Sequence, residues 1–177
     1  MTMNNELMQQ ESVRRSMDKR LDSSLLISPE TLHQKHWLSF PVPDILNPME
    51  AEWLADAIHA KGVQEVVGIA FEYEGKPDIE TMPVTQESLL TYNGSNSWRT
   101  VMMTSADEDF LYYKDEANRY YLLCGDQVFL SQAYRCTLRT AKAMYFDEWV
   151  NLDHHSKEER GFMTEIWNRY VGEDDTA

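Results

Sequence analysis

The chain has 177 residues, of which 42% are hydrophobic and 11% aromatic, and its formal net charge at pH 7 is −14. This length and composition are sufficient for one folded domain with a hydrophobic core, and they exclude a globally disordered chain. The negative charge disfavours direct binding to nucleic acid or anionic membranes, and no run approaches the ~20 apolar residues of a membrane span.

The first 24 residues are polar and lack a continuous apolar stripe, which predicts a flexible N-terminal arm. Residues 1–22 carry four basic and four acidic groups, so the whole net charge belongs to the body that follows. The body, residues 25–172, is predicted to be a single α+β domain, and residues 173–177 a disordered acidic tail. The arm also lacks the apolar core of a secretory signal.

A short helix is predicted over residues 28–40. Ser28 is a favourable N-cap, and Pro29 follows at the first helical position. Pro41 and Pro43 are expected to end this helix, because proline cannot continue the hydrogen-bond ladder.

A second helix is predicted over residues 47–62, where the terminal signals are strongest. Asn47 and Glu50 have the spacing of a capping box, and Gly62 follows the last apolar residue of the helical pattern. Glu50 is expected to face solvent.

Alternating apolar and polar residues, with β-branched and aromatic side chains, then predict an antiparallel meander of about five strands. The strand segments are 63–75, 78–84, 98–105, 109–114 and 118–125. Pro83 indicates an edge strand or a strand end. Residues 85–96 are predicted to be a short helix or a wide loop.

Two polar connections flank the strand at residues 109–114, and both carry carboxylates. Both faces of this strand are apolar, with Tyr112 on one face and Tyr113 on the other, so we expect it to be covered on both sides or to line a groove. Hydrated turn residues are the ordinary interpretation of such carboxylates.

The remainder is predicted to be helical, with a break near Cys136 and a last helix that begins at Ser156 and Glu159 with a capping box. Cys124 and Cys136 show no metal-binding spacing, which indicates reduced thiols in a cytoplasmic protein. No nucleotide-binding motif is present, and we expect neither a cofactor nor a metal ion.

The functional hypothesis starts from charge. Between residues 44 and 87 there are ten acidic and two basic groups, a local net charge of −8. Acidic groups around aromatic anchors are typical of a protein that captures a basic partner. The residues expected to form this face are Asp107, Glu108, Asp109, Asp115, Glu116, Glu72, Glu74, Tyr112, Tyr113 and Trp98.

The sequence therefore predicts a small binding protein without catalysis. Its most concrete form is an inhibitor, of the immunity, antitoxin or phage-antagonist type, that blocks a basic nuclease or nucleic-acid-binding protein. The oligomeric state stays open.

Two alternatives remain. One is a hydrolytic enzyme or small-ligand-binding protein with a pocket between the meander and the last helices. There His154 or His155, beside Asp153, would be the base, and Arg135 or Arg139 would bind an anion. The other is a structural adaptor that docks through its N-terminal arm. Arg135, Arg139 and Lys142 would share one helix face, where pairing with the protein's own carboxylates is the ordinary interpretation.

Overall fold

The computed structural model describes residues 2–72 and 76–172, and within them the chain forms seven α-helices, one π-helical turn and one sheet. The strands are β1 (Leu38–Pro43), β2 (Glu65–Phe71), β3 (Asp78–Pro83), β4 (Thr100–Thr104), β5 (Leu111–Lys114) and β6 (Tyr120–Gly125). The helices are α1 (Thr2–Asp18), α2 (Pro29–Lys35), α3 (Pro48–Ala60), α4 (Gln86–Ser95), α5 (Gln127–Ala133), α6 (Leu138–Tyr145) and α7 (Lys157–Tyr170), with the π-helical turn over Phe146–Val150. The predicted acidic tail, 173–177, lies outside the described residues.

The sheet has six antiparallel strands in the order β1-β6-β5-β4-β2-β3. Strands β4, β5 and β6 form a meander, β1 pairs with β6, and the β2–β3 hairpin pairs through β2 with β4. The predicted α+β class is confirmed, with one strand more than expected. No helix in the described part of the chain combines the length and apolar character needed to cross a membrane.

The additional strand is β1. Residues 38–40 were expected to continue a helix, but α2 ends at Lys35 and His36 adopts a left-handed conformation with φ of 53°. The two prolines that indicated a helix end, Pro41 and Pro43, lie in β1 itself. An edge strand tolerates proline because one side of its backbone pairs with no other strand, and β1 is at the edge of the sheet.

The N-terminus of α3 has the predicted capping box. The Glu50 amide donates to Asn47 Oδ1 at 3.0 Å, and the Asn47 amide donates to Glu50 Oε2 at 3.2 Å. The expectation that Glu50 faces solvent is wrong, because its side chain is buried and burial raises the pKa of its carboxyl group.

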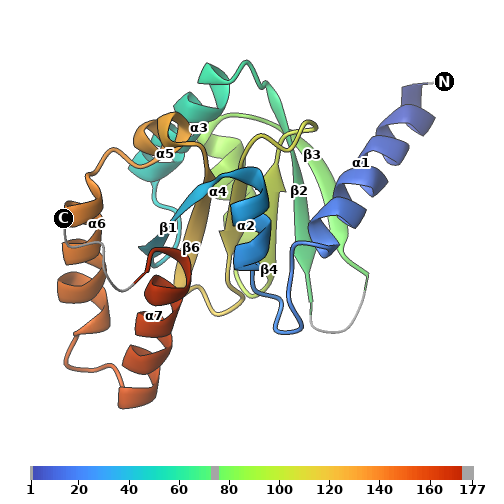
Figure 1. Cartoon of the computed structure of the whole chain (residues 1–177). Coiled ribbons are helices and arrows are strands. Elements are labelled where there is room, and N and C mark those ends of the chain that lie inside the picture. Colours follow the sequence, from blue (N-terminus) through green and yellow to red (C-terminus); the bar gives the residue numbers. More distant parts are fainter. Residues whose placement is uncertain (1, 73–75, 173–177) are drawn as a thin grey trace.

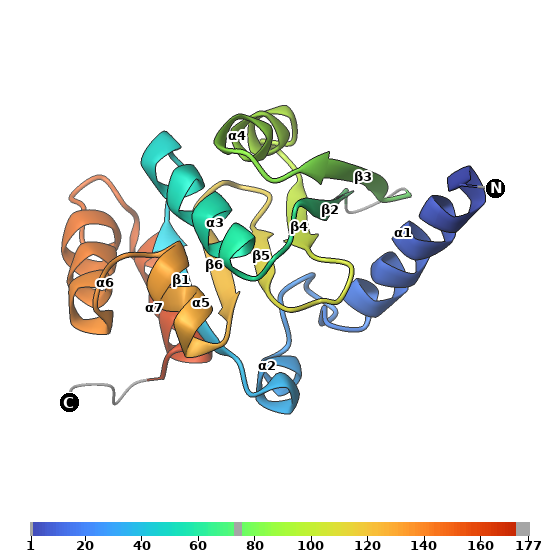
Figure 2. The ribbon, with the colours of Figure 1, turned by 90° about the horizontal axis from the view of Figure 1, so that it is seen from above.

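Helices cover both faces of the sheet. Figure 2 shows α3 and α4 on one side and α1 and α2 on the other, with α6 beyond the edge strand β1. Tyr112 of β5 stacks on Tyr121 of β6, with ring centroids 5.4 Å apart, and its hydroxyl donates to Asn93 of α4. Tyr113 faces the other way and donates to the carbonyl of Leu25. The prediction of a strand covered on both sides is therefore confirmed.

The segment expected to be a flexible arm contains the helix α1, which projects from the body in Figure 1. Val13 and Met17 are buried at its C-terminal end, and Arg14 pairs with Glu11 and Asp18. The apolar stripe is only this i, i+4 pair, which is why the sequence pattern did not predict a docked helix.

The C-terminal helices follow the predicted pattern. The break near Cys136 separates α5 from α6, and Thr137 caps α6 by accepting the Thr140 amide. Ser156 and Glu159 form the predicted capping box of α7.

Candidate protein-docking surface

The acidic residues that were assigned to one face lie at opposite ends of the sheet. Asp107, Glu108 and Asp109 belong to the β4–β5 connection, whereas Asp115 and Glu116 belong to the β5–β6 connection. Because β5 is antiparallel to both neighbours, these two connections leave it in opposite directions. The two groups are therefore separated by the length of β5 and do not form one cluster.

In the β4–β5 connection Glu108 is already engaged. Its carboxylate accepts a hydrogen bond from Ser16 Oγ at 2.8 Å and forms an ion pair with Arg20, whose side chain is nearly buried. These contacts attach the end of α1 to the sheet. Asp107 is exposed and Asp109 half-buried, so this end offers a partner little free charge.

In the β5–β6 connection Asp115 has a structural role. Its side chain is buried and accepts the backbone amides of Arg119 at 2.7 Å and Tyr120 at 3.3 Å. The Arg119 Nε donates to the same carboxylate at 2.8 Å. Asp115 therefore stabilises the turn from within, whereas the neighbouring Glu116 is exposed.

Tyr112 and Tyr113, expected as anchors for a partner, are core residues instead. Both side chains are buried, and both hydroxyls donate to groups of the protein itself. Burial raises the pKa of each phenol, so both stay protonated. Neither can contact a partner without unfolding of the sheet.

Among the aromatic residues that the structure describes, Trp98 is the one whose side chain is exposed. It lies between α4 and β4, and 80% of its surface is exposed. Its indole offers a large apolar area with one polar N–H group, the combination that suits an anchor at a protein interface.

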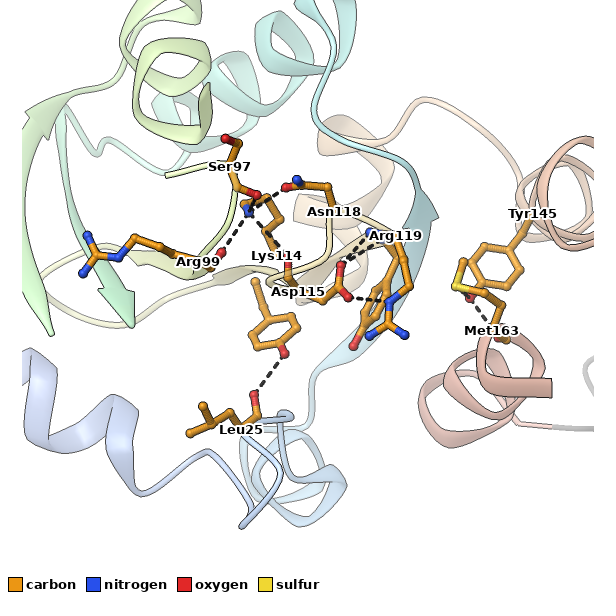
Figure 3. Close-up of polar contacts among 11 residues, drawn as sticks. Leu25, Ser97, Arg99, Lys114, Asp115, Asn118, Arg119, Tyr145 and Met163 are labelled. Carbon is orange, nitrogen blue, oxygen red and sulfur yellow. Dashed lines mark hydrogen bonds and ion pairs between the residues drawn. The ribbon is translucent and has the colours of Figure 1, made fainter. Parts of the chain in front are cut away.

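The backbone on either side of Trp98 is held by a buried lysine. Lys114 Nζ donates to the carbonyls of Ser97 at 3.2 Å and Arg99 at 2.8 Å, and to Asn118 Oδ1 at 2.9 Å, as Figure 3 shows. Burial lowers the pKa of Lys114 to about 8. The indole is thus exposed while its backbone is fixed.

Arg99, which follows Trp98 in the sequence, forms ion pairs with two exposed carboxylates. Arg99 Nη1 lies 2.7 Å from Asp78 Oδ2, and its Nε lies 3.3 Å from Glu72 Oε1. The Arg99 side chain is only 18% exposed, whereas the side chains of Glu72 and Asp78 are 62% and 78% exposed. The positive group lies inside and the negative groups lie outside.

We use the name Trp98 surface for the exposed residues at the end of the sheet where β2 and β5 finish and β4 and β6 begin. The Asp44 amide donates to the Arg119 carbonyl at 3.0 Å, which brings the end of β1 to the same place. The Trp98 surface consists of Asp44, Ile45, Glu72, Asp78, Trp98 and Glu116. The exposed Lys76 follows in the β2–β3 connection, and Glu74, expected at this site, lies outside the described residues.

The histidine and arginine residues of the catalytic alternative do not converge. The rings of His154 and His155 lie 4.6 Å apart, next to Trp149. Arg135 instead pairs with Asp56 at 2.7 Å, and Arg139 is exposed on α6. A cavity of about 270 Å³ between α2, β1 and α7 is lined by none of these four residues.

The described residues also provide no group of metal ligands and no reactive thiol at Cys124. Across residues 2–72 and 76–172, no three histidine, cysteine or acidic side chains are grouped in a way that could hold a metal ion. Cys124 is buried, and burial raises the pKa of its thiol, which keeps the sulfur protonated.

Comparison of the chain with protein-family models found no matching model, and comparisons with curated proteins and with solved structures found no significant match. Its function is therefore inferred from its own surface and contacts.

Three residues of this site were not singled out from the sequence: Ile45, Arg99 and Lys114. The signal for Lys114 was present, because it follows Phe110 and Tyr112 at two-residue spacing and so points to the same buried face. Arg99 carried no such signal, since its partners Glu72 and Asp78 are distant in the sequence.

Proposed function

We propose that this protein binds a basic protein partner through the Trp98 surface and inhibits it by occupying its nucleic-acid-binding cleft. The observation that supports this most strongly is the exposed indole of Trp98, fixed at its backbone and flanked by exposed carboxylates. Tryptophan is enriched among the residues that dominate binding energy at protein interfaces.

The electrostatic arrangement favours a basic partner. Arg99 and Lys114 are turned inward onto carboxylates and carbonyls, so most of the charge exposed at the Trp98 surface is negative. With a net charge of −14 on the whole chain, the long-range field attracts a basic protein and repels a second copy of this one. Carboxylates spaced over a surface can replace phosphates in a basic cleft.

A cytoplasmic location suits this proposal. Cys124 and Cys136 are both free thiols, as is usual in reducing compartments.

The first test is affinity capture from the native cell with three immobilised proteins: wild type, Trp98→Ala and Leu38→Ala. Leu38 is the matched control, because it is an exposed apolar residue at the other end of the sheet, opposite Gly125. We expect a basic protein on the wild-type and Leu38→Ala columns, released by heparin, and at least ~10-fold less on the Trp98→Ala column, as for loss of a binding hot spot.

Equal retention on the Trp98→Ala column would reject the Trp98 surface. If the captured protein is a nuclease or binds nucleic acid, stoichiometric addition of wild-type protein should abolish that activity, and undiminished activity would reject inhibition.

An adaptor role is the second candidate, and one observation favours it. Leu7 and Met8 are 56% and 67% exposed on α1, which projects from the body. If α1 were the docking element, the double change Leu7→Ala and Met8→Ala would abolish capture while Trp98→Ala would not.

A further inference from the structure

Lys114 has an environment unlike that of any ordinary lysine. Its side chain has no exposed surface, and its ammonium group lies within hydrogen-bond distance of four oxygen atoms. They are the carbonyls of Ser97, Arg99 and Asp115 and the side-chain Oδ1 of Asn118, at 3.2, 2.8, 3.4 and 2.9 Å. These acceptors belong to two connections that are separate in sequence.

We infer that Lys114 is a positioning residue for Trp98: its ammonium group fixes the backbone on both sides of the indole and so presents the indole to the partner. This role rests on the proposed function. It explains how the backbone of the Trp98 segment is held in place.

The geometry supports this role because Ser97 and Arg99 are the immediate neighbours of Trp98. The Ser97 carbonyl belongs to the peptide group that precedes the Trp98 Cα, and the Arg99 carbonyl to the peptide group after Arg99, so one lysine holds the chain just before and just after Trp98. A pre-ordered anchor loses less conformational entropy on binding than a mobile one, so fixing the backbone raises affinity without any new contact.

The bond to Asn118 joins this support to the neighbouring turn. Asn118 has a φ of 56°, in the left-handed region, and its Oδ1 accepts from Lys114 while Asp115 holds the same turn through the Arg119 amide. The Trp98 segment and the β5–β6 turn therefore share one buried cation.

Protonation of Lys114 controls how many of these bonds exist. An ammonium group has three donors, whereas a neutral amine has two and a lone pair that four oxygen atoms would face. The charged groups around it are Asp115, which favours the ammonium form, and Arg99, whose guanidinium is directed away to Asp78; Tyr121 lies opposite on β6. Burial lowers the pKa of Lys114 to about 8, so the amine loses its third donor at mildly alkaline pH.

Stability and local order should respond to pH in opposite directions. Between pH ~8 and ~10.5 the unfolded chain retains a proton on this lysine that the folded chain has released, so this group adds stability as pH rises. Over the same range the Trp98 segment loses a tether, so its mobility should increase.

The test labels the five tryptophans with 5-fluorotryptophan and follows them by fluorine NMR, with the Trp98 resonance assigned from Trp98→Phe. The variants are Lys114→Met, which keeps the length but removes the donors, and Lys76→Met, an exposed lysine of the β2–β3 connection, as control. At pH 7 we expect Lys114→Met to shift and broaden the Trp98 resonance alone, and Lys76→Met to leave it unchanged. Wild type at pH ~9.5 should show a smaller change in the same direction as Lys114→Met, because the neutral amine keeps two of its three donors.

An unchanged Trp98 resonance in folded Lys114→Met would overturn the inference. If Lys114→Met does not fold, the wild-type titration decides: a Trp98 resonance that does not move between pH 7 and pH ~9.5 overturns it equally.

The consequence for binding is tested with the partner from the capture experiment. We expect Lys114→Met to weaken binding ~10-fold, and to have no further effect in a chain that already carries Trp98→Ala, since coupled residues are not additive. Equal effects of Lys114→Met with and without Trp98 would show a general structural role and overturn the inference. Binding that does not depend on Trp98 at all would reject the proposed function, while the NMR result would still decide the role of Lys114.

Discussion

At the scale of single residues, adjacent acidic side chains in this protein have different roles. Asp115 is buried and accepts three hydrogen bonds from the turn that follows it, whereas Glu116 is exposed. Sequence alone did not separate them, because both lie in one polar connection between strands. The difference depends on the direction in which each side chain leaves the turn.

This difference predicts unequal effects on stability. Asp115→Ala removes the acceptor of the part-buried Arg119 amide and the buried Tyr120 amide, and should lower the free energy of unfolding by roughly 2–3 kcal/mol. Glu116→Ala should change it by less than about 0.5 kcal/mol, as for other exposed substitutions. Urea denaturation followed by circular dichroism measures both, and similar values for the two variants would contradict the assigned roles.

Strand periodicity predicted that Tyr112 and Tyr113 face opposite sides of the sheet, and this is confirmed. It did not predict that helices and loops cover both sides so completely that neither ring reaches the surface. That outcome depends on contacts between residues distant in the sequence, such as the hydrogen bond from the Tyr113 hydroxyl to the carbonyl of Leu25.

At the scale of secondary-structure elements, local signals predicted helix ends well and the attachment of elements poorly. The capping boxes of α3 and α7 are formed by neighbouring residues, so the sequence displays them directly. The strand β1 was missed because its prolines indicate a helix end in isolation, and only the pairing with β6 shows that they occupy an edge.

The attachment of α1 gives a prediction at this scale. Glu108→Gln removes the charge that pairs with the nearly buried Arg20, and α1 should detach from the β4–β5 connection. We expect amide hydrogen exchange in residues 13–18 to accelerate by ~30-fold, which corresponds to about 2 kcal/mol of lost local stability.

Asp107→Asn is the matched control for α1, because Asp107 is exposed in the same connection. Exchange in residues 13–18 that is equally slow in both variants would show that the ion pair does not hold α1.

At the scale of the whole molecule, the acidic character was evident from composition, but its arrangement was not. The two connections of β5 carry carboxylates of similar appearance, and only the sheet topology places them at opposite ends. One end is occupied by contacts with α1, and the other is open around Trp98. The expected acidic face thus reduces to the Trp98 surface.

The most direct test compares charge reversal at the two ends, using the purified partner from the capture experiment and surface plasmon resonance. Glu72→Lys with Glu116→Lys alters the Trp98 surface, and Asp107→Lys with Asp109→Lys alters the other end by the same charge. We predict that the first pair slows association at least ~10-fold at low salt, that the second pair changes it less than ~2-fold, and that raising the salt concentration removes the difference. Equal effects of the two pairs, or a larger effect of the second, would contradict binding through the Trp98 surface.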